Sequence, residues 1–174
     1  MTAESSLTAT TKKRPRRISS FSLPVHAANS QLNFMAQTTI IIQTSGLGLY
    51  EFTDEAADFV RKVGTDTGLL TVFVRHTSAS LLIQENADPD VSGDIQAFFA
   101  RLVPPANDPA MSYLTHRVEG FDDMPAHIKS ALTQTSVSIP IGDGHLMLGT
   151  WQGLYLFEHR HHSHRREVVL HAGA

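Results

Sequence analysis

The sequence predicts an α+β fold, because helix-like segments follow strand-like ones in its first two thirds and strands dominate its last third. With 174 residues and no internal repeat, the chain is long enough to bury one substantial core. Hydrophobic residues make up 41% of it and the mean hydropathy is −0.11, as in globular domains. No apolar run approaches the roughly 18 residues of a membrane span.

The first predicted elements are a strand at residues 38–44 and a helix at residues 53–63. In that helix the apolar residues recur every three or four positions, a threonine and an aspartate can cap its start, and Gly64 can end it. Leu69–Arg75 is apolar and β-branched, which indicates a buried strand.

A second helix is predicted to begin at Asp88 and Pro89, since aspartate is a good cap and proline suits the first helical position. Pro104 and Pro105 stop it. Residues 104–122 then form a long polar loop, and a short helix follows at 125–132. The second helix is expected to bury an apolar stripe in the core: Val91, Ile95, Phe98 and Leu102.

The last third contains four strand-like segments and one hairpin signal. Gly142-Asp-Gly144 is typical of a hairpin turn, and Pro140 indicates a sheet edge or a bulge. The predicted strands are Ser136–Ile141, His145–Gly149, Leu154–His159 and Glu167–His171.

Residues 1–34 differ from the domain at 35–174. They are rich in Ser and Thr, contain the basic run 12–17 and lack periodicity, so we expect a disordered basic tail. An organelle-targeting presequence, a basic interaction tail and an over-extended translation start each explain it. We favour the last, because Met35 directly precedes the first strand.

Charge and motif content exclude several classes of function. The tail has a net charge of +4, so the other 140 residues carry −7 of the total −3, which argues against a nucleic-acid groove. The absence of cysteine excludes thiolate catalysis, cysteine zinc sites and disulfides. The sequence contains no phosphate loop, Gly-x-Ser-x-Gly elbow or His-Glu-x-x-His pair.

The most informative group of ionisable side chains lies in residues 120–130, Gly-Phe-Asp-Asp-Met-Pro-Ala-His-Ile-Lys-Ser, which are typical of a helix start. Asp122 or Asp123 can cap the predicted helix. Asp123 and His127 are four residues apart and share a helix face, so they can hold one metal ion or one proton. A capped surface helix with an incidental histidine explains the same pattern.

A second group follows the predicted strand at 69–75. His76 stands at its end, where a rigid strand commonly presents functional side chains on a loop. Glu85, Asn86 and Asp88 can supply oxygen ligands or a general base, although Asp88 can equally be only a helix cap.

His116 lies in the predicted loop and is either solvated or a metal ligand. With His76 and His127 it can complete a histidine-rich site for a divalent ion. Separations of about 40 and 11 residues between these histidines match no diagnostic motif.

Two further patterns have competing explanations. Trp151, between two glycines, is either an exposed platform that stacks on an aromatic ligand or a core residue at a bulge. Glu158 and Arg160 can form a salt bridge at a surface or subunit contact. The run at 159–164 contains four histidines, but it lies where a turn is expected, so we expect its imidazoles in solvent and only adventitious metal binding.

Four ordered motifs occur within about residues 36–172: His76-Thr-Ser-Ala-Ser80, Glu85-Asn86 with Asp88-Pro89, Glu119 through Ser130, and Gly149-Thr-Trp-Gln-Gly153 with Glu158-His-Arg160. Together they strongly resemble the YjbQ family, whose members are also named secondary thiamine-phosphate synthase enzymes. Gln84 departs from the family, which commonly has Asn there.

The resemblance implies a YjbQ-like α+β domain with a barrel-like, mostly antiparallel β-sheet and two to three helices. It also implies a homotrimer with polar pockets near subunit contacts, and a divalent ion, zinc or magnesium, held chiefly by histidines. The implied site positions are His76, Glu85, Asn86, His116, Asp122, Asp123, His127, Thr150 and Gln152.

We assign expected roles from the resemblance and from residue type. The expected catalytic residues are His76, Glu85, Asp123 and His127. The expected metal ligands are His76, His116 and His127. The expected substrate-binding residues are Ser78, Asn86, Lys129, Ser130, Thr150, Trp151, Gln152 and Arg160.

The family's enzyme name implies that an aminopyrimidine diphosphate is joined to a thiazole phosphate with release of pyrophosphate. A metal and cations such as Lys129 or Arg160 would neutralise the leaving diphosphate, and Trp151 would stack on the pyrimidine. The word secondary indicates that this activity need not be the cell's use of the protein.

Two alternatives stay open. One is a non-catalytic trimeric module that binds a phosphorylated small molecule, and the other is a metal-dependent hydrolase in which Glu85 or Asp123 activates water. In every case we expect a cytoplasmic protein without nucleic-acid or membrane partners.

Overall fold

The computed structural model describes residues 35–173. It confirms the predicted α+β class, with antiparallel strands and three α-helices, but the strands are divided between two curled sheets. The predictions for residues 1–34 lie outside the described residues.

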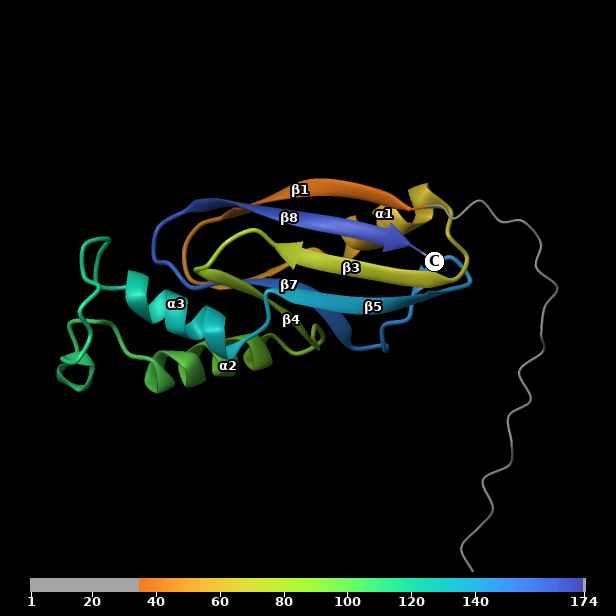
Figure 1. The fold of residues 1–174 in the computed structure, drawn as a ribbon. Coiled ribbons are helices and arrows are strands. Elements are labelled where there is room, and N and C mark those ends of the chain that lie inside the picture. Colours follow the sequence, from red (N-terminus) through yellow and green to blue (C-terminus); the bar gives the residue numbers. More distant parts are fainter. Residues whose placement is uncertain (1–34, 174) are drawn as a thin grey trace, which may run out of the picture. The chain divides into compact units, whose positions relative to one another are not determined.

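The larger sheet has five strands in the order β1-β8-β3-β5-β6. Figure 1 shows β1, β8, β3 and β5 one after another in this order. All neighbouring strands are antiparallel, and β1 pairs with β8 from Ala36 opposite Ala172 to Thr44 opposite His164. The first and last strands of the domain are therefore adjacent. The strands are β1 (Ala36–Thr44), β3 (Gly68–Val74), β5 (Ser136–Gly142), β6 (His145–Leu146) and β8 (His164–Gly173).

The smaller sheet has the order β2-β7-β4, and consists of β2 (Gly48–Glu51), β7 (Gln152–Glu158) and β4 (Ala79–Glu85). β4 and β7 are antiparallel, from Ala79 opposite Glu158 to Glu85 opposite Gln152. The start of β4 and the end of β7 therefore lie side by side, and so do the end of β4 and the start of β7.

The hydrophobic core lies between the inner faces of the two sheets and against α1 (Thr53–Val63). Alternate residues of the strands, such as Val72 and Leu170, are buried, as the two-residue period of a strand requires. Val60 adds the apolar face predicted for α1, and the helix ends at Gly64 in the left-handed conformation with φ 71°.

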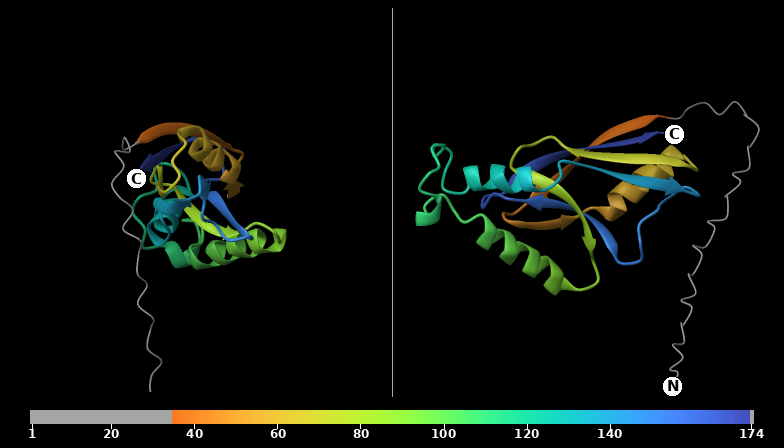
Figure 2. Two further views of the ribbon diagram at one scale, coloured as in Figure 1. Left: turned by 90° about the vertical axis from the view of Figure 1, so that its right-hand side faces the viewer. Right: turned by 60° about the horizontal axis from the view of Figure 1, so that its bottom comes forward.

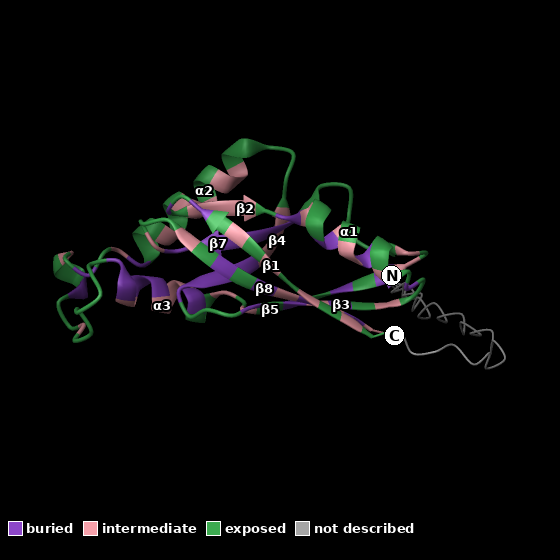
Figure 3. Cartoon of the chain, turned by 90° about the horizontal axis from the view of Figure 1, so that it is seen from above, coloured by how far each residue is buried: buried purple, intermediate pink, exposed green. Residues whose placement is uncertain are grey.

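Helix α2 (Pro89–Leu102) begins as predicted, with the Asp88 side chain accepting a hydrogen bond at its start, but the predicted burial is wrong. No residue of α2 is buried (Figure 3). Phe98 and Leu102 are each 53% exposed. Phe99 instead packs edge-on against Phe157 of β7. α2 lies on the face of the smaller sheet that is turned away from the core. Because this sheet is narrow, it covers only part of the helix surface, and no α2 side chain becomes buried.

The predicted loop at residues 104–122 is organised around Arg117. It contains a short 3₁₀ helix, η1 (Pro109–Met111), and leads into α3 (Asp123–Leu132). Figures 1 and 2 show this loop and α3 at one end of the domain, away from the C-terminal end of β8. The Arg117 guanidinium donates hydrogen bonds of 2.8–3.3 Å to the carbonyl oxygens of Ala106, Met111, Ser112 and Leu114.

The hairpin predicted at residues 142–144 is present, but the strand after it is shorter than predicted. Asp143 and Gly144 have φ values of 51° and 74°, which suit the two central positions of a type I′ turn. β6 then contains only two residues, which pair with Ile141 and Gly142, and the Met147 backbone beyond it donates to the Pro140 carbonyl oxygen at 2.9 Å.

Candidate metal centre and adjoining cavity

The start of α3 places two buried carboxylates beside Arg160. Asp122 occupies the N-cap position, but its side chain makes no capping hydrogen bond to the helix, contrary to the prediction. Its Oδ2 instead accepts hydrogen bonds from the His161 backbone at 2.8 Å and from Arg160 Nε at 3.2 Å. Arg160 Nη1 donates to Asp123 Oδ1. Burial by itself raises the pKa of Asp122, but the hydrogen bonds from His161 and Arg160 outweigh it and hold that pKa below its usual value.

Asp123 brings two of the predicted histidines together. Its Oδ2 lies 2.9 Å from His116 Nε2 and 3.3 Å from His127 Nε2, and one ligand atom from each residue lies within 4.8 Å of the others. Asp123 and His127 come from successive turns of α3, as their spacing predicted. Asp123, and not His76, lies beside His116 and His127 in this cluster, and the predicted ligand role of His76 stays a prediction.

The backbone determines which nitrogen of His127 faces the cluster. His127 Nδ1 lies 3.0 Å from the carbonyl oxygen of Thr77, and a carbonyl only accepts, so Nδ1 carries a hydrogen. In the neutral ring, the lone pair of Nε2 then points at the Asp123 carboxylate. The two groups then repel each other unless a positive charge lies between them, either a second proton on the ring or a metal ion. Metal-ligating histidines commonly have this second hydrogen bond to a carbonyl.

A cavity of about 610 Å³ adjoins the cluster at His127. His76 and Ser130 also line it, with Phe73 and Ala131 supplying apolar surface. Ser130 Oγ donates to the carbonyl oxygen of Ala79 at 3.1 Å, so this side chain ties α3 to β4. Three predicted site residues line the cavity. Ser130 is engaged with Ala79 and His127 faces the cluster, so His76 is the one whose side chain is best placed to contact a molecule in the cavity.

His76 is held by the turn that follows it. Its Nδ1 lies 3.1 Å from both the backbone nitrogen and the Oγ of Ser78. Partial burial, and then the nearby Arg166 cation, lower the pKa of His76 below its usual value of 6.5.

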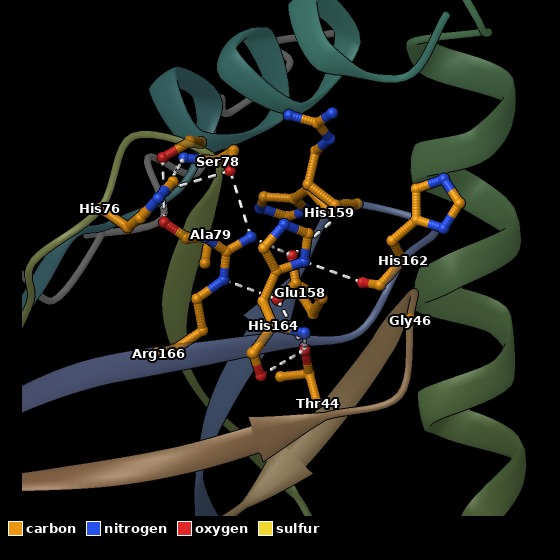
Figure 4. A network of polar contacts seen from close by, with 12 residues as sticks. Thr44, Gly46, His76, Ser78, Ala79, Glu158, His159, His162, His164 and Arg166 are labelled. Carbon is orange, nitrogen blue, oxygen red and sulfur yellow. Dashed lines mark hydrogen bonds and ion pairs between the residues drawn. The ribbon is translucent and has the colours of Figure 1, made fainter. Parts of the chain in front are cut away.

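A buried ion pair that was not predicted from the sequence lies behind His76 (Figure 4). Arg166 donates to both carboxylate oxygens of Glu158, at 2.6 and 2.7 Å, and also reaches Ser78 Oγ at 3.2 Å. Both charged side chains are essentially inaccessible to solvent. Burial alone raises the pKa of Glu158, but the hydrogen bonds from Arg166 outweigh it, and the net shift is downward. The sequence contained one signal for it: Arg166 lies two and four residues before Val168 and Leu170, so it points to the same, buried face of the strand.

The histidines of residues 159–164 were predicted to be exposed, and this prediction is wrong for His159. His159 is 1% exposed and lies 2.9 Å from Ser80 Oγ, whereas His161 and His162 are exposed as expected. Burial, followed by the Lys129 charge, lowers the pKa of His159 to about 3. Lys129 is itself half-buried, and this burial lowers its pKa, with a partial offset from Asp122.

The remaining predicted residues lie elsewhere in the chain. Glu85 ends β4 opposite Gln152 at the start of β7, and these residues are exposed, as is Trp151 with 63% of its surface accessible. Glu85 lies six residues after Ala79, the first residue of β4, and a strand rises about 3.4 Å per residue. The two ends of β4 are therefore about 20 Å apart. We call the two ends the histidine end (His76, His116, Asp123, His127, Glu158, Arg166) and the tryptophan end (Glu85, Asn86, Thr150, Trp151, Gln152).

The tryptophan end has a simpler polar structure. Asn86 Nδ2 donates to Glu51 Oε1 at 3.3 Å, and Gln152 Oε1 accepts from the Gly149 backbone at 2.7 Å. Glu51 was not among the predicted site residues, since it is an isolated carboxylate in the sequence. In one chain, this group of residues cannot contact a molecule bound beside His127.

Comparison with known proteins shows the same domain in other organisms. A family model described as UPF0047 protein YjbQ-like matches residues 37–173. A UPF0047 protein from Synechocystis is 56% identical over 135 residues, which cover 78% of this chain and 89% of that protein. The YjbQ protein of Salmonella typhimurium is 42% identical over 134 residues, 76% of this chain and 94% of the relative.

Solved structures show the same fold. A YjbQ/UPF0047-family protein from Clostridium acetobutylicum matches with a TM-score of 0.69 and 34% identity, covering 78% of this chain and 98% of that one. A hypothetical protein from Aeropyrum pernix matches with a TM-score of 0.70 and 27% identity, covering 79% and 97%. The chain belongs to the YjbQ/UPF0047 family.

Proposed function

We propose that the protein is a metal-assisted enzyme that acts on a phosphorylated small molecule at the histidine end. One observation carries the proposal: Nε2 of His127, whose ring is oriented by the Thr77 carbonyl, faces the buried Asp123 carboxylate and His116. A cation between them would turn a repulsive contact into a favourable one.

The donor set fits zinc better than magnesium. Two imidazole nitrogens and one carboxylate oxygen are ligands that zinc accepts, whereas magnesium prefers oxygen ligands alone. Three protein ligands leave a coordination position open, as in catalytic zinc sites. Such a metal would supply a positive charge that stabilises negative charge developing on phosphate oxygens.

The side chains around the cluster hold and orient its ligands. Arg160 holds both Asp122 and Asp123 and donates to the Glu119 carbonyl, so we assign it to the support of the cluster. For Lys129 we propose the role expected from the sequence, which is to neutralise the charge of a bound phosphate. His76 contacts the molecule in the cavity.

Within this class, we propose the thiamine-phosphate synthase reaction expected from the resemblance. It would need the pyrimidine to stack on Trp151, which lies at the other end of β4 and β7. We therefore propose a homotrimer in which the tryptophan end of one subunit lies beside the histidine end of its neighbour. The outer face of the larger sheet exposes Ile41, Leu69 and Phe73, which suits burial against another subunit.

We also propose that the protein works in the cytoplasm. Among residues 35–173, no helix combines the length and apolar character needed to cross a bilayer.

Metal titration of the full chain without an affinity tag tests the centre. We expect one Zn²⁺ per chain, and His127→Ala should weaken its binding at least about a hundredfold, since losing a ligand costs more than losing a supporting contact. His162→Ala is the matched control, because His162 is an exposed histidine outside the cluster. Equal affinity in both variants would remove the proposed centre.

Product formation distinguishes the candidate activities. With an aminopyrimidine diphosphate and a thiazole phosphate, the wild-type protein should form thiamine phosphate, and His127→Ala should not. Formation at the wild-type rate by His127→Ala would contradict the assignment. Saturable binding of a phosphorylated ligand with no product would instead identify a binding module.

A further inference from the structure

One peptide group orients two imidazoles on the wall of the same cavity. The Thr77 carbonyl accepts from His127 Nδ1 at 3.0 Å, and the N–H of Ser78, on the other side of the same peptide bond, donates to His76 Nδ1 at 3.1 Å. A carbonyl can only accept and an amide N–H can only donate. His127 Nδ1 must therefore carry a hydrogen, and His76 Nδ1 must not.

We propose that the Thr77–Ser78 peptide gives the two histidines opposite tautomers and thereby different roles. His127 presents the lone pair of Nε2 to the metal cluster, whereas His76 presents an Nε2–H as a fixed hydrogen-bond donor to a phosphate or diphosphate oxygen in the cavity. The identity of this acceptor rests on the proposed function. The two tautomers rest only on the backbone contacts.

Ser78 strengthens the orientation of His76 through its side chain. Its Oγ lies 3.1 Å from His76 Nδ1 and accepts a hydrogen bond from Arg166 Nη2 at 3.2 Å. Because arginine has no acceptor, the hydroxyl hydrogen is left to point at His76 Nδ1. This nitrogen therefore accepts from two donors of one residue.

Arg166 cannot easily turn away from Ser78. Its other contacts are the two hydrogen bonds to Glu158, and Glu158 also accepts from Thr44 Oγ1 at 3.0 Å. All of these side chains are buried, so water does not compete for their hydrogen bonds. Ser78 and Arg166 are thus positioning residues for His76, and Glu158 holds Arg166 in place.

His76 is correspondingly a poor metal ligand. Its Nδ1 is occupied by two donors, and a ligand at Nε2 would require the loss of the hydrogen there. This accounts for its place outside the cluster of His116, Asp123 and His127. A neutral N–H beside a cation suits an anionic oxygen, because it adds a directional donor without like-charge repulsion of the metal.

Nitrogen NMR of the protein labelled with ¹⁵N-histidine tests the tautomers directly. Long-range ¹H–¹⁵N correlations at neutral pH should show a bare Nδ1 and a protonated Nε2 for His76, and the reverse for His127. The His76→Gln and His127→Gln variants assign the signals. A protonated Nδ1 on His76 would overturn the proposal.

The serine link has its own readout. Ser78→Ala keeps the backbone N–H but removes the hydroxyl donor and the connection to Arg166. The bare Nδ1 signal of His76 should move towards that of a free imidazole, while the signals of His127 stay unchanged. An unchanged His76 signal would remove Ser78 and Arg166 as positioning residues.

Addition of Zn²⁺ separates this inference from the proposed metal centre. We expect the Nε2 signals of His116 and His127 to shift and the tautomer of His76 to persist. If no histidine responds, the metal centre is wrong and the tautomer assignment stands. If His76 Nε2 becomes a zinc-bound nitrogen, the donor role is wrong and the metal centre stands.

Binding of inorganic pyrophosphate in magnesium buffer tests the donor. The amide nitrogen of glutamine can replace His76 Nε2–H, whereas the shorter asparagine amide reaches only the Nδ1 position. His76→Ala and His76→Asn should weaken binding roughly tenfold to a hundredfold, and His76→Gln should recover most of it. Equal affinities for all three variants would exclude a hydrogen bond from Nε2.

Discussion

The histidine end and the tryptophan end are built differently, although the resemblance groups their residues into one site. At the histidine end, Arg166, Glu158 and Asp123 are buried and their charges are matched by partners within hydrogen-bond distance. At the tryptophan end, Trp151 and Glu85 are exposed and the polar contacts are few.

This difference shows which end is pre-organised. Burying a charge costs several kcal/mol unless it is paired, so the charges of the histidine end are confined to the geometry in which they satisfy one another. Exposed side chains at the tryptophan end keep their rotamer freedom and can adapt to a ligand or to a neighbouring subunit. Variants and pH changes should therefore affect the two ends unequally.

The largest expected effect is acid destabilisation through His159. The folded chain protonates this residue only near pH 3 and the unfolded chain near 6.5, so the unfolded state binds more protons in between. Stability should therefore fall with decreasing pH across this window, by about 2 kcal/mol at pH 5 and about 5 kcal/mol over the whole of it.

Urea unfolding of the wild type and of His159→Gln at pH 7.5 and pH 5 measures this contribution. The variant should lose about 2 kcal/mol less than the wild type between the two pH values. An identical loss in both proteins would mean that His159 is protonated in the folded chain at pH 5.

The next largest effect concerns the buried ion pair. Arg166→Met should lower the free energy of unfolding by about 3–5 kcal/mol, because it leaves the Glu158 charge buried without its partner. The matched substitution at the other end, Glu85→Ala, should change it by less than about 0.5 kcal/mol. Chemical denaturation at neutral pH measures both.

A double variant identifies the cause. Arg166→Met with Glu158→Gln removes both charges and should recover much of the lost stability. If the double variant is no more stable than Arg166→Met, lost packing of the arginine side chain, and not an unpaired charge, explains the effect.

A smaller effect is expected from Arg117, which holds the loop that carries His116. Arg117→Lys cannot satisfy the same four carbonyl oxygens, so His116 should become less well positioned. The affinity for Zn²⁺ should fall about tenfold, as for other residues that orient metal ligands. Calorimetric titration should show no change for Arg165→Lys, whose arginine is exposed. Equal affinities for the two variants would show that His116 does not depend on the loop.

The parts of the site that the sequence predicted are those set by local geometry. Asp123 and His127 share a helix face because an α-helix repeats every 3.6 residues, and the structure places both beside His116. The error with Phe98 and Leu102 has a different cause. Their spacing predicts which face of α2 is apolar, but not how much sheet is available to cover that face.

The sequence by itself determined the α+β class, the strand alternation that identifies the core, and the meeting of a carboxylate and an imidazole at the start of α3. Only the tertiary structure decided that Arg166 pairs with Glu158, that His159 is buried, and that one peptide bond holds His76 and His127. Backbone periodicity acts over a few residues and is therefore visible in the sequence. Contacts between distant segments depend on how the packed chain removes charges and imidazoles from water, and only the folded arrangement specifies that.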